Sequence, residues 1–322
     1  MKKIVSIILS LLTIFNFGCR RGFQLDLTLS LDNEYGYLTA YFLSVGEGDA
    51  TLIRFNSGKI MLIDTGVNSK TVTDYLSHAL SIAGGNTIDY LVLSHPDWQH
   101  VGNVKYLLEN FHVRKIITPK IYSLTKYTAF QSFYAEILSS GVEIDFVDGK
   151  SYEEDETYFA FITPFGNDYI NAKVPIEDSP YTEEDFDDFA VATYLECKGK
   201  RFLLSSDCSK LAEENISNNF ETGFFDLLYG KDKINLRDID FYKASGHGSA
   251  KSNCAKLLNI LSPKNALISV GANNPNWLPA TAMLERLVIS NENVRIFRTD
   301  VDGTITVRLN ESGQAKIETS VF

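Results

Sequence analysis

The chain has few of the residues that most often build disulfide frameworks, basic surfaces or large metal clusters. Its 322 residues include four cysteines, five histidines and two tryptophans. No two cysteines form a Cys-x-x-Cys pair, and an odd number remains beyond Cys19, so they cannot all pair within the chain. We expect buried free thiols, with one disulfide as the alternative if the protein is exported. The three residues are Cys197, Cys208 and Cys254.

Positive charge is also scarce. The formal net charge is -11 and the isoelectric point is near 5.0. Lysine and arginine form scattered pairs such as Arg114-Lys115, and no long basic run occurs. This balance excludes a general polyanion binder, because nucleic acid would be repelled at long range. A local basic groove that binds nucleic acid is still compatible with this composition.

The N-terminus carries an apolar run that is too short for a standard transmembrane helix. Residues Ile4–Phe17 follow Lys2-Lys3 and end at Gly18-Cys19, a pattern typical of a secretory signal. A small residue directly before cysteine resembles a bacterial lipoprotein cleavage site. We therefore predict a signal peptide over residues 1–18, lipidation of Cys19, and a tether over 19–36. This places the protein outside the cytoplasm, anchored to a bacterial membrane by lipid, with plain secretion or an uncleaved anchor as alternatives.

From Tyr37 onward, strand and helix patterns alternate, and no repeat or linker divides them. Tight turns join three strand-like runs in Tyr37–Ile63, which predicts an antiparallel meander. A second hairpin is expected around Lys198-Gly-Lys200. Helices are predicted at Lys70–Ile82, Val101–Asn110, Phe130–Leu138, Leu211–Ile216, Cys254–Leu261 and Thr281–Ile289. This α/β order fits a single domain over residues 37–322, built as a four-layer αβ/βα sandwich.

One stretch concentrates groups that can bind metal. The apolar run Tyr90–Leu93 reads as a buried strand, and His95, Asp97 and His100 follow it directly. A further histidine, His247, lies in a glycine-rich loop. Imidazole and carboxylate are ligand types that zinc and similar divalent ions prefer.

Ser94-His95-x-Asp97-x-Gln99-His100 resembles the first metal-binding motif of the metallo-β-lactamase superfamily, in the variant found in bacterial competence (ComEC-type) DNA-uptake proteins. Four further segments resemble that family in the same order: Leu43–Ala50, Asp64-Thr-Gly66, Phe202–Asp207 and Lys243–Ser249. The resemblance implies the sandwich fold and hydrolysis of phosphoester or phosphodiester bonds by a metal-bound hydroxide. The substrate would be a small molecule or a nucleic acid. No protein partner can be inferred.

The same resemblance implies a set of site residues. His95 and Asp97 would bind one divalent metal, His100 and His247 a second, and Asp207 would bridge them, with Asp97 and Asp207 as the catalytic carboxylates. Zinc is expected, as one or two ions, with manganese as an alternative. Asp64 and Gln99 would not bind the metal themselves but would help to hold the ligands in place.

This chain departs from the family pattern at three positions. Gln99 replaces an aspartate, Gly246 replaces the first of two histidines, and Leu278 stands where a histidine is usual. The opposing hypothesis is therefore a surface-anchored binding module with a degenerate metal site.

Each candidate also has a structural interpretation. His95 and His100 would be polar loop residues, Asp207 a helix N-cap, and Asp64 and His247 turn residues. Trp98 and Trp277 would either line the groove between the two expected sheets or cover the apolar core. The acidic run Glu183–Asp188 is interpreted as a solvated loop, or as a rim that collects cations.

Overall fold

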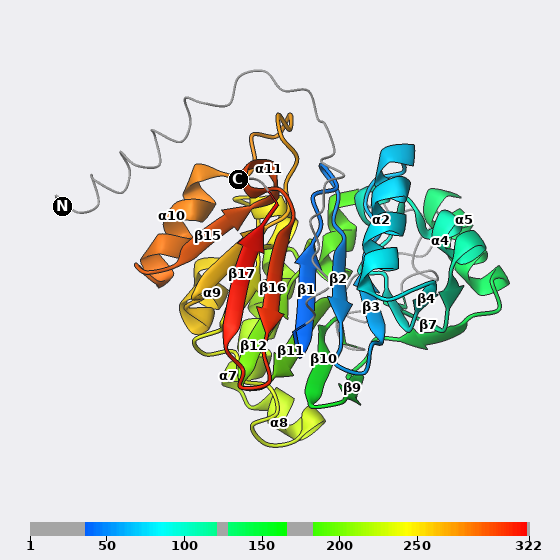
Figure 1. Ribbon diagram of the computed structural model, residues 1–322. Helices are drawn as coiled ribbons and strands as arrows, with labels where there is room; N and C mark the ends of the chain where they lie inside the picture. Colours follow the sequence, from blue (N-terminus) through cyan, green and yellow to red (C-terminus); the bar gives the residue numbers. More distant parts are fainter. Residues whose placement is uncertain (1–35, 121–127, 166–182, 321–322) are drawn as a thin grey trace, which may run out of the picture.

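Two β-sheets packed face to face form the centre of the protein (Figure 1). The computed structural model describes residues 36–120, 128–165 and 183–320. The first sheet has the strand order β17-β16-β1-β2-β3-β5-β7-β8 and the second the order β15-β14-β13-β12-β11-β10-β9. A short pair, β4-β6, lies apart from both.

The strands of the first sheet are β1 (Leu38–Phe42), β2 (Thr51–Arg54), β3 (Ile60–Ile63), β5 (Tyr90–Val92), β7 (Lys115–Thr118), β8 (Glu143–Phe146), β16 (Ile305–Leu309) and β17 (Ala315–Thr319). Those of the second are β9 (Ser151–Glu154), β10 (Thr157–Thr163), β11 (Ala192–Cys197), β12 (Lys200–Leu204), β13 (Phe241–Lys243), β14 (Asn265–Ile268) and β15 (Arg295–Arg298). The small pair consists of β4 (Thr87–Ile88) and β6 (His112–Val113).

The helices are α2 (Lys70–Ala83), α3 (Trp98–Val101), α4 (Val104–Asn110), α5 (Thr128–Ser139), α7 (Lys210–Glu221), α8 (Phe224–Tyr229), α9 (Ala255–Leu261), α10 (Thr281–Ser290) and α11 (Thr299–Asp302). Two 3-10 turns, η1 (Glu183–Phe189) and η2 (Ser245–Gly248), complete the described elements.

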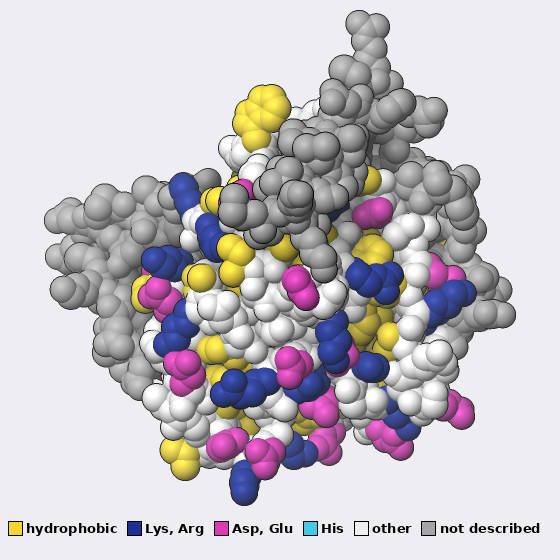
Figure 2. Space-filling model, turned by 90° about the vertical axis from the view of Figure 1, so that its left-hand side faces the viewer, with side chains coloured by type: hydrophobic (Ala, Val, Ile, Leu, Met, Phe, Trp, Pro, Cys, Tyr) yellow, Lys and Arg dark blue, Asp and Glu magenta, His cyan; other side chains and the backbone are white. Residues whose placement is uncertain are grey.

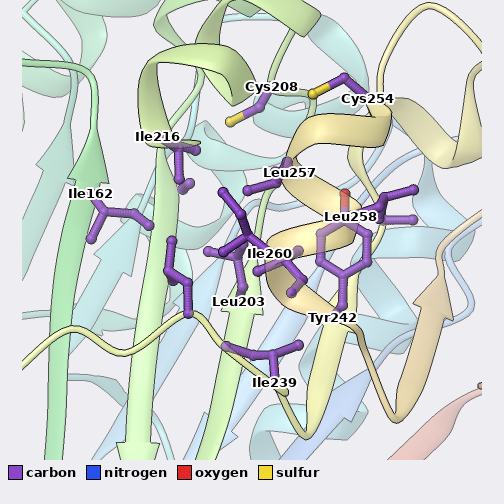
Figure 3. Packing of buried hydrophobic residues seen from close by; sticks show 14 of the residues in the cluster. Ile162, Leu203, Cys208, Ile216, Ile239, Tyr242, Cys254, Leu257, Leu258 and Ile260 are labelled. Carbon is purple, nitrogen blue, oxygen red and sulfur yellow. The ribbon is translucent and has the colours of Figure 1, made fainter. Parts of the chain in front are cut away.

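Three separate apolar interfaces show that the molecule has four layers. Alternate residues of one strand point to opposite faces, so Leu62 of β3 packs under helices while Met61 and Ile63 pack between the sheets. The outer face of the second sheet packs against α7, α8, α9 and α10. Figure 3 shows this packing, with Leu257 and Leu258 of α9 beside Leu203 of β12. The four-layer αβ/βα sandwich predicted from the sequence is confirmed.

The strand connections bring several loops to one end of the sandwich. β1, β2 and β3 form the predicted antiparallel meander, whereas β3 and β5 run parallel, as do β12 and β13. The carboxyl ends of parallel strands meet at the same edge of a sheet. The loops that follow these four strands carry Asp64, His95, Asp207 and His247, so the two sheets present these side chains from facing edges.

The structure corrects one helix prediction. The expected single helix Val101–Asn110 is two helices, α3 and α4, because the chain turns at Gly102 and Asn103. A Cβ on Gly102 would lie 2.3 Å from the backbone nitrogen of Asn68, so this close approach of two loops requires glycine. β17 and the small β4-β6 pair were not expected. The hairpin of β11 and β12 around Lys198-Gly-Lys200 is as predicted.

Cys197, Cys208 and Cys254 are buried and free, as predicted. The signal peptide, the Cys19 lipidation site and nearly all of the 19–36 tether lie outside the described residues. Among the helices that the structure describes, none combines the length and the apolar character needed to cross a bilayer.

Candidate metal centre

The carboxylate of Asp64 is a hydrogen-bond hub between the two sheets. It follows β3 with a φ of 60° and is 1% exposed. Its Oδ1 accepts the backbone N–H of Ser94 at 2.9 Å, and its Oδ2 accepts the Ser94 hydroxyl at 2.7 Å. Oδ2 also accepts Nδ1–H of His100 at 2.8 Å and the hydroxyl of Ser206 at 3.2 Å. Asp64 therefore supports loops from both sheets, which is more than an ordinary turn residue does.

Hydrogen bonds fix three imidazoles so that each presents Nε2. His100 donates from Nδ1 to Asp64. His247 lies 2.9 Å through Nδ1 from the carbonyl of Ser269, which can only accept, so Nδ1 carries the proton. Nδ1 of His95 is 3.0 Å from the Ser94 hydroxyl. Nε2 of all three rings is buried without a hydrogen-bond partner, and it is the atom through which a deprotonated imidazole nitrogen can bind a metal. Burial would lower the pKa of His100, but Asp207 and Asp64 outweigh it and raise that pKa well above its usual value.

Asp207, at the end of the loop after β12, faces two of these rings. Its Oδ2 lies 3.3 Å from Nε2 of His100 and 3.5 Å from Nε2 of His247. Burial would raise the pKa of Asp207, but the two imidazoles outweigh it and hold that pKa well below its usual range. Two ligands about 2.1 Å from a tetrahedral ion lie about 3.4 Å apart. The observed spacing is close to that value.

The N-cap interpretation of Asp207 is wrong, because Ser209 caps α7 through Ala212 N. A cap belongs instead to Asp97, whose Oδ1 accepts Gln99 N at 2.7 Å at the start of α3.

A buried ion pair completes the group. Asp49, from the loop after β1, is paired through Oδ2 with the ammonium of Lys243, at the end of β13. Burial would raise the pKa of Asp49, but Lys243 lowers it below its usual value. Oδ1 of Asp49 has no hydrogen-bond partner. One ligand atom from each of Asp49, His100, Asp207 and His247 lies within 4.8 Å of the others. These atoms form a possible metal-binding cluster.

His95 and Asp97 lie beside this cluster but are not part of it. The rings of His95 and His100 are 4.2 Å apart between centroids, and burial together with His100 lowers the pKa of His95 to about 4. Asp187, in η1, places Oδ1 3.7 Å from Nε2 of His95. Asp187 thus lies beside the site with its side chain 32% exposed, while its neighbours Phe186 and Phe189 are buried.

Sequence reasoning missed Asp49, Lys243 and Asp187 as site residues. Asp49 and Lys243 were inside segments that matched the family motifs, so their positions carried a signal. Asp187 had only its place in an acidic run. The remaining histidines lie elsewhere, His78 half-buried in α2 and His112 exposed in β6. His112 borders the hollow between α4 and α5, which contains none of the candidate ligands.

A family model described as the metallo-beta-lactamase superfamily matches residues 43–271. The chain belongs to this superfamily. The match covers β2 to β14 together with every candidate ligand above. The superfamily has a hydrolase-like fold and binds divalent metals, and the buried cluster is where this chain could hold one.

Known proteins agree with that assignment. "ComE operon protein 3" of Bacillus subtilis (strain 168) is 24% identical over 230 residues, which is 71% of this chain and 26% of that protein. The chain thus spans about a quarter of its curated relative. Tm1679, described as a metal-dependent hydrolase of the beta-lactamase superfamily, superposes with a TM-score of 0.50 and 13% identity over 88% of this chain and 99% of that one.

CmlA, a diiron beta-hydroxylase from Streptomyces venezuelae, superposes with a TM-score of 0.51 and 12% identity over 86% of this chain and 55% of that one. Its name describes an oxidative reaction on the same fold. These structures therefore establish the fold, and the reaction has to be argued from the site.

Two of the three departures from the superfamily motifs lie together. Gln99 and Leu278 line one small hollow with His247, Asn274 and Asn276. The third has a backbone cause: Gly246 has a φ of +55°, and a Cβ there would lie 2.9 Å from Oγ of Ser252. A histidine at this position would adopt an unfavourable left-handed backbone conformation, and its Cβ would crowd Oγ of Ser252.

The hub geometry generates a stability prediction. Asp64→Asn should lower the free energy of unfolding by about 3 kcal/mol, because it leaves buried donors around the hub without an anionic acceptor. Urea unfolding of the metal-free protein measures this. Asp74→Asn is the matched control, since Asp74 pairs with Lys70 on the exposed face of α2 and should change stability by less than about 1 kcal/mol. Equal effects of the two substitutions would contradict the hub role.

Proposed function

We propose that this protein is an exported metal-dependent hydrolase that acts on phosphoester or phosphodiester bonds. The observation that carries the proposal is the cluster of Asp49, His100, Asp207 and His247, whose ligand atoms converge within 4.8 Å. Each of the four side chains also has a buried polar atom without a hydrogen-bond partner. Leaving such atoms unpaired costs free energy, so a cation that pairs with them fits this site.

Zinc suits the donor set best. Two imidazole nitrogens and two carboxylates match its preference for mixed nitrogen and oxygen ligands, and manganese is the alternative that carboxylates favour. When bound, such an ion would polarise the scissile group and lower the pKa of a water molecule towards neutrality. The remaining functions fall to side chains of the chain itself.

Those side chains hold the ligands in place and position the attacking water. Asp64 orients His100, and the Ser269 carbonyl orients His247. Lys243 neutralises one oxygen of Asp49, which reduces the cost of burying several carboxylates together. Asp207, whose pKa is held low, is ionised at neutral pH, so one of its carboxylate oxygens can bind the cation and the other can accept a hydrogen bond from the attacking water.

We assign supporting roles to the residues next to the cluster. His95 and Asp97 would bind a second ion if one enters, with Asp207 between the two positions. The phosphoester class rests on the resemblance of the motifs to the competence-protein domain. DNA uptake itself does not carry over with it, because the chain spans 26% of that relative and is strongly acidic.

A binding module with a degenerate site is the second candidate. Gln99 and Leu278 favour it, because both replace groups that could bind metal and both border the hollow beside His247. The four retained ligands argue against it.

Metal content separates the two candidates. We expect the purified chain to hold at least about one equivalent of zinc, and His247→Ala to lose it, because that change removes one of four ligands. Elemental analysis after reconstitution and desalting measures both. His112→Ala, in the exposed strand β6, should keep the metal. A wild-type chain that binds neither zinc nor manganese would remove the hydrolase proposal and leave the binding module.

A second test restores the missing charge at position 99. Gln99→Asp should raise zinc affinity by about tenfold or more, because it adds a carboxylate beside His247. Competition with a chelator measures the change, and Gln99→Asn is the control of similar polarity. If the aspartate and asparagine variants bind zinc equally, position 99 does not face the metal.

We also propose that the chain is anchored outside the cytoplasm through a lipid on Cys19. The support is the sequence pattern of residues 1–19. In bacterial cells the wild-type chain should partition into the membrane fraction and into detergent, whereas Cys19→Ser should not, because it lacks the thiol that is lipidated. Mass spectrometry of the N-terminal peptide checks the lipid directly. Unmodified Cys19 in the exported protein would overturn lipidation.

A further inference from the structure

Both tryptophans of the chain are exposed, and both lie next to the candidate metal centre. Trp98 is 54% exposed and Trp277 is 87% exposed. Trp98 directly precedes Gln99, and Trp277 lies between Asn276 and Leu278; these three neighbours line the same hollow as His247. Tryptophan is highly buried on average. Exposing both at one site leaves apolar surface in water that a ligand could cover.

The exposure of Trp277 is fixed by its loop. Trp277 has a φ of +56°, a conformation that is rare and strained for a bulky side chain. The side chain of Asn274 holds the loop from inside: Nδ2 donates to the carbonyls of Gly271 and Leu278, and Oδ1 accepts Leu278 N at 2.8 Å. Strain of this kind persists where the surroundings enforce it, and it often marks functional positions.

The hollow beside Trp277 offers hydrogen bonds as well. The amides of Gln99 and Asn276 border it, and within the described part of the chain neither side chain has a hydrogen-bond partner. An amide presents one acceptor and two donors, a pattern that matches the edge of a nucleobase. A planar ring that stacks on tryptophan while its edge meets an amide would use both features.

Charge limits the size of the ligand. The net charge of -11 repels long polyanions. On the face shown in Figure 2, basic and acidic side chains are interspersed, and no broad basic surface is present there. A ligand with one or two phosphates carries less negative charge than a nucleic acid, so the acidic protein would repel it less.

We propose that Trp277 is a substrate-binding residue that stacks on a planar, hydrogen-bonding ring, and that the substrate is a nucleotide-sized phosphoester. Gln99 and Asn276 contact the edge of the ring, and Trp98 lies at the same rim. The inference rests on the proposed phosphoester function and specifies its substrate class.

The test compares a phosphate that has a base with one that lacks it. The full chain, loaded with zinc, is titrated with AMP and with ribose 5-phosphate by calorimetry, and tryptophan emission is followed in Trp98→Phe, where Trp277 is the sole source. AMP should bind more tightly and quench this emission. Trp277→Ala should weaken AMP binding by about 5- to 150-fold and leave ribose 5-phosphate binding unchanged. Trp277→Phe should retain most of the affinity for AMP.

Other outcomes overturn the inference. Equal affinity for the two phosphates, or AMP binding that does not respond to Trp277→Ala, removes the stacking role while zinc content and phosphodiester hydrolysis can still stand. A blue shift of Trp277 emission with phosphatidylcholine vesicles, without a response to AMP, assigns the tryptophan to a membrane surface instead. Absence of bound metal in the wild-type chain removes the proposed function separately.

Discussion

The carboxylate of Asp64 is the interaction on which the geometry of the site depends. It accepts hydrogen bonds from Ser94 and His100, which follow β5, and from Ser206, which follows β12. The apolar packing between the two sheets has no preferred direction. A buried, charged acceptor does set direction, and it fixes the His100 ring with Nε2 facing Asp207. The apolar layer supplies most of the cohesion, and the hub supplies the alignment.

Charge balance explains why so many ionisable groups can be buried here. Asp49 and Asp64 are 2% and 1% exposed, and each has a cationic or proton-donating partner, Lys243 and His100. Burial works against the charged form of Lys243, but Asp49 more than compensates and raises its pKa above the usual value. Each residue of the cluster still has one buried polar atom without a hydrogen-bond partner. A divalent cation would therefore add the charge that the chain's own groups leave unmet.

Much of the fold could be predicted from the sequence because its signals are local. The alternation in the first meander, the turn at Lys198-Gly-Lys200 and the helical period of Lys70–Ile82 each arise within a few residues. The boundary at Gly102 could not be predicted in this way, because its cause is the backbone of Asn68 on another loop. Ser209 and Asp97 show the same limit for helix caps, since several polar residues near each helix start could have served.

The site was predicted only in part, for a related reason. His95, Asp97, His100, Asp207 and His247 were named from motifs, and the structure brings all of them to one end of the sandwich, although His95 and Asp97 lie outside the closest cluster. Asp49 and Lys243 are 194 positions apart in sequence, and no local pattern reveals that they pair. Whether any of these side chains binds metal remains a prediction.

The three departures from the family motifs have different physical meanings. Gly246 satisfies a left-handed backbone that a larger residue would strain, so its presence says little about lost function. Gln99 and Leu278 change the chemistry of the hollow beside His247, replacing groups that could bind metal with an amide and an apolar surface. Asp49 still provides a carboxylate oxygen to the cluster. The candidate ligands that this chain retains are therefore concentrated in one cluster, and the departures at positions 99 and 278 are confined to the hollow beside it.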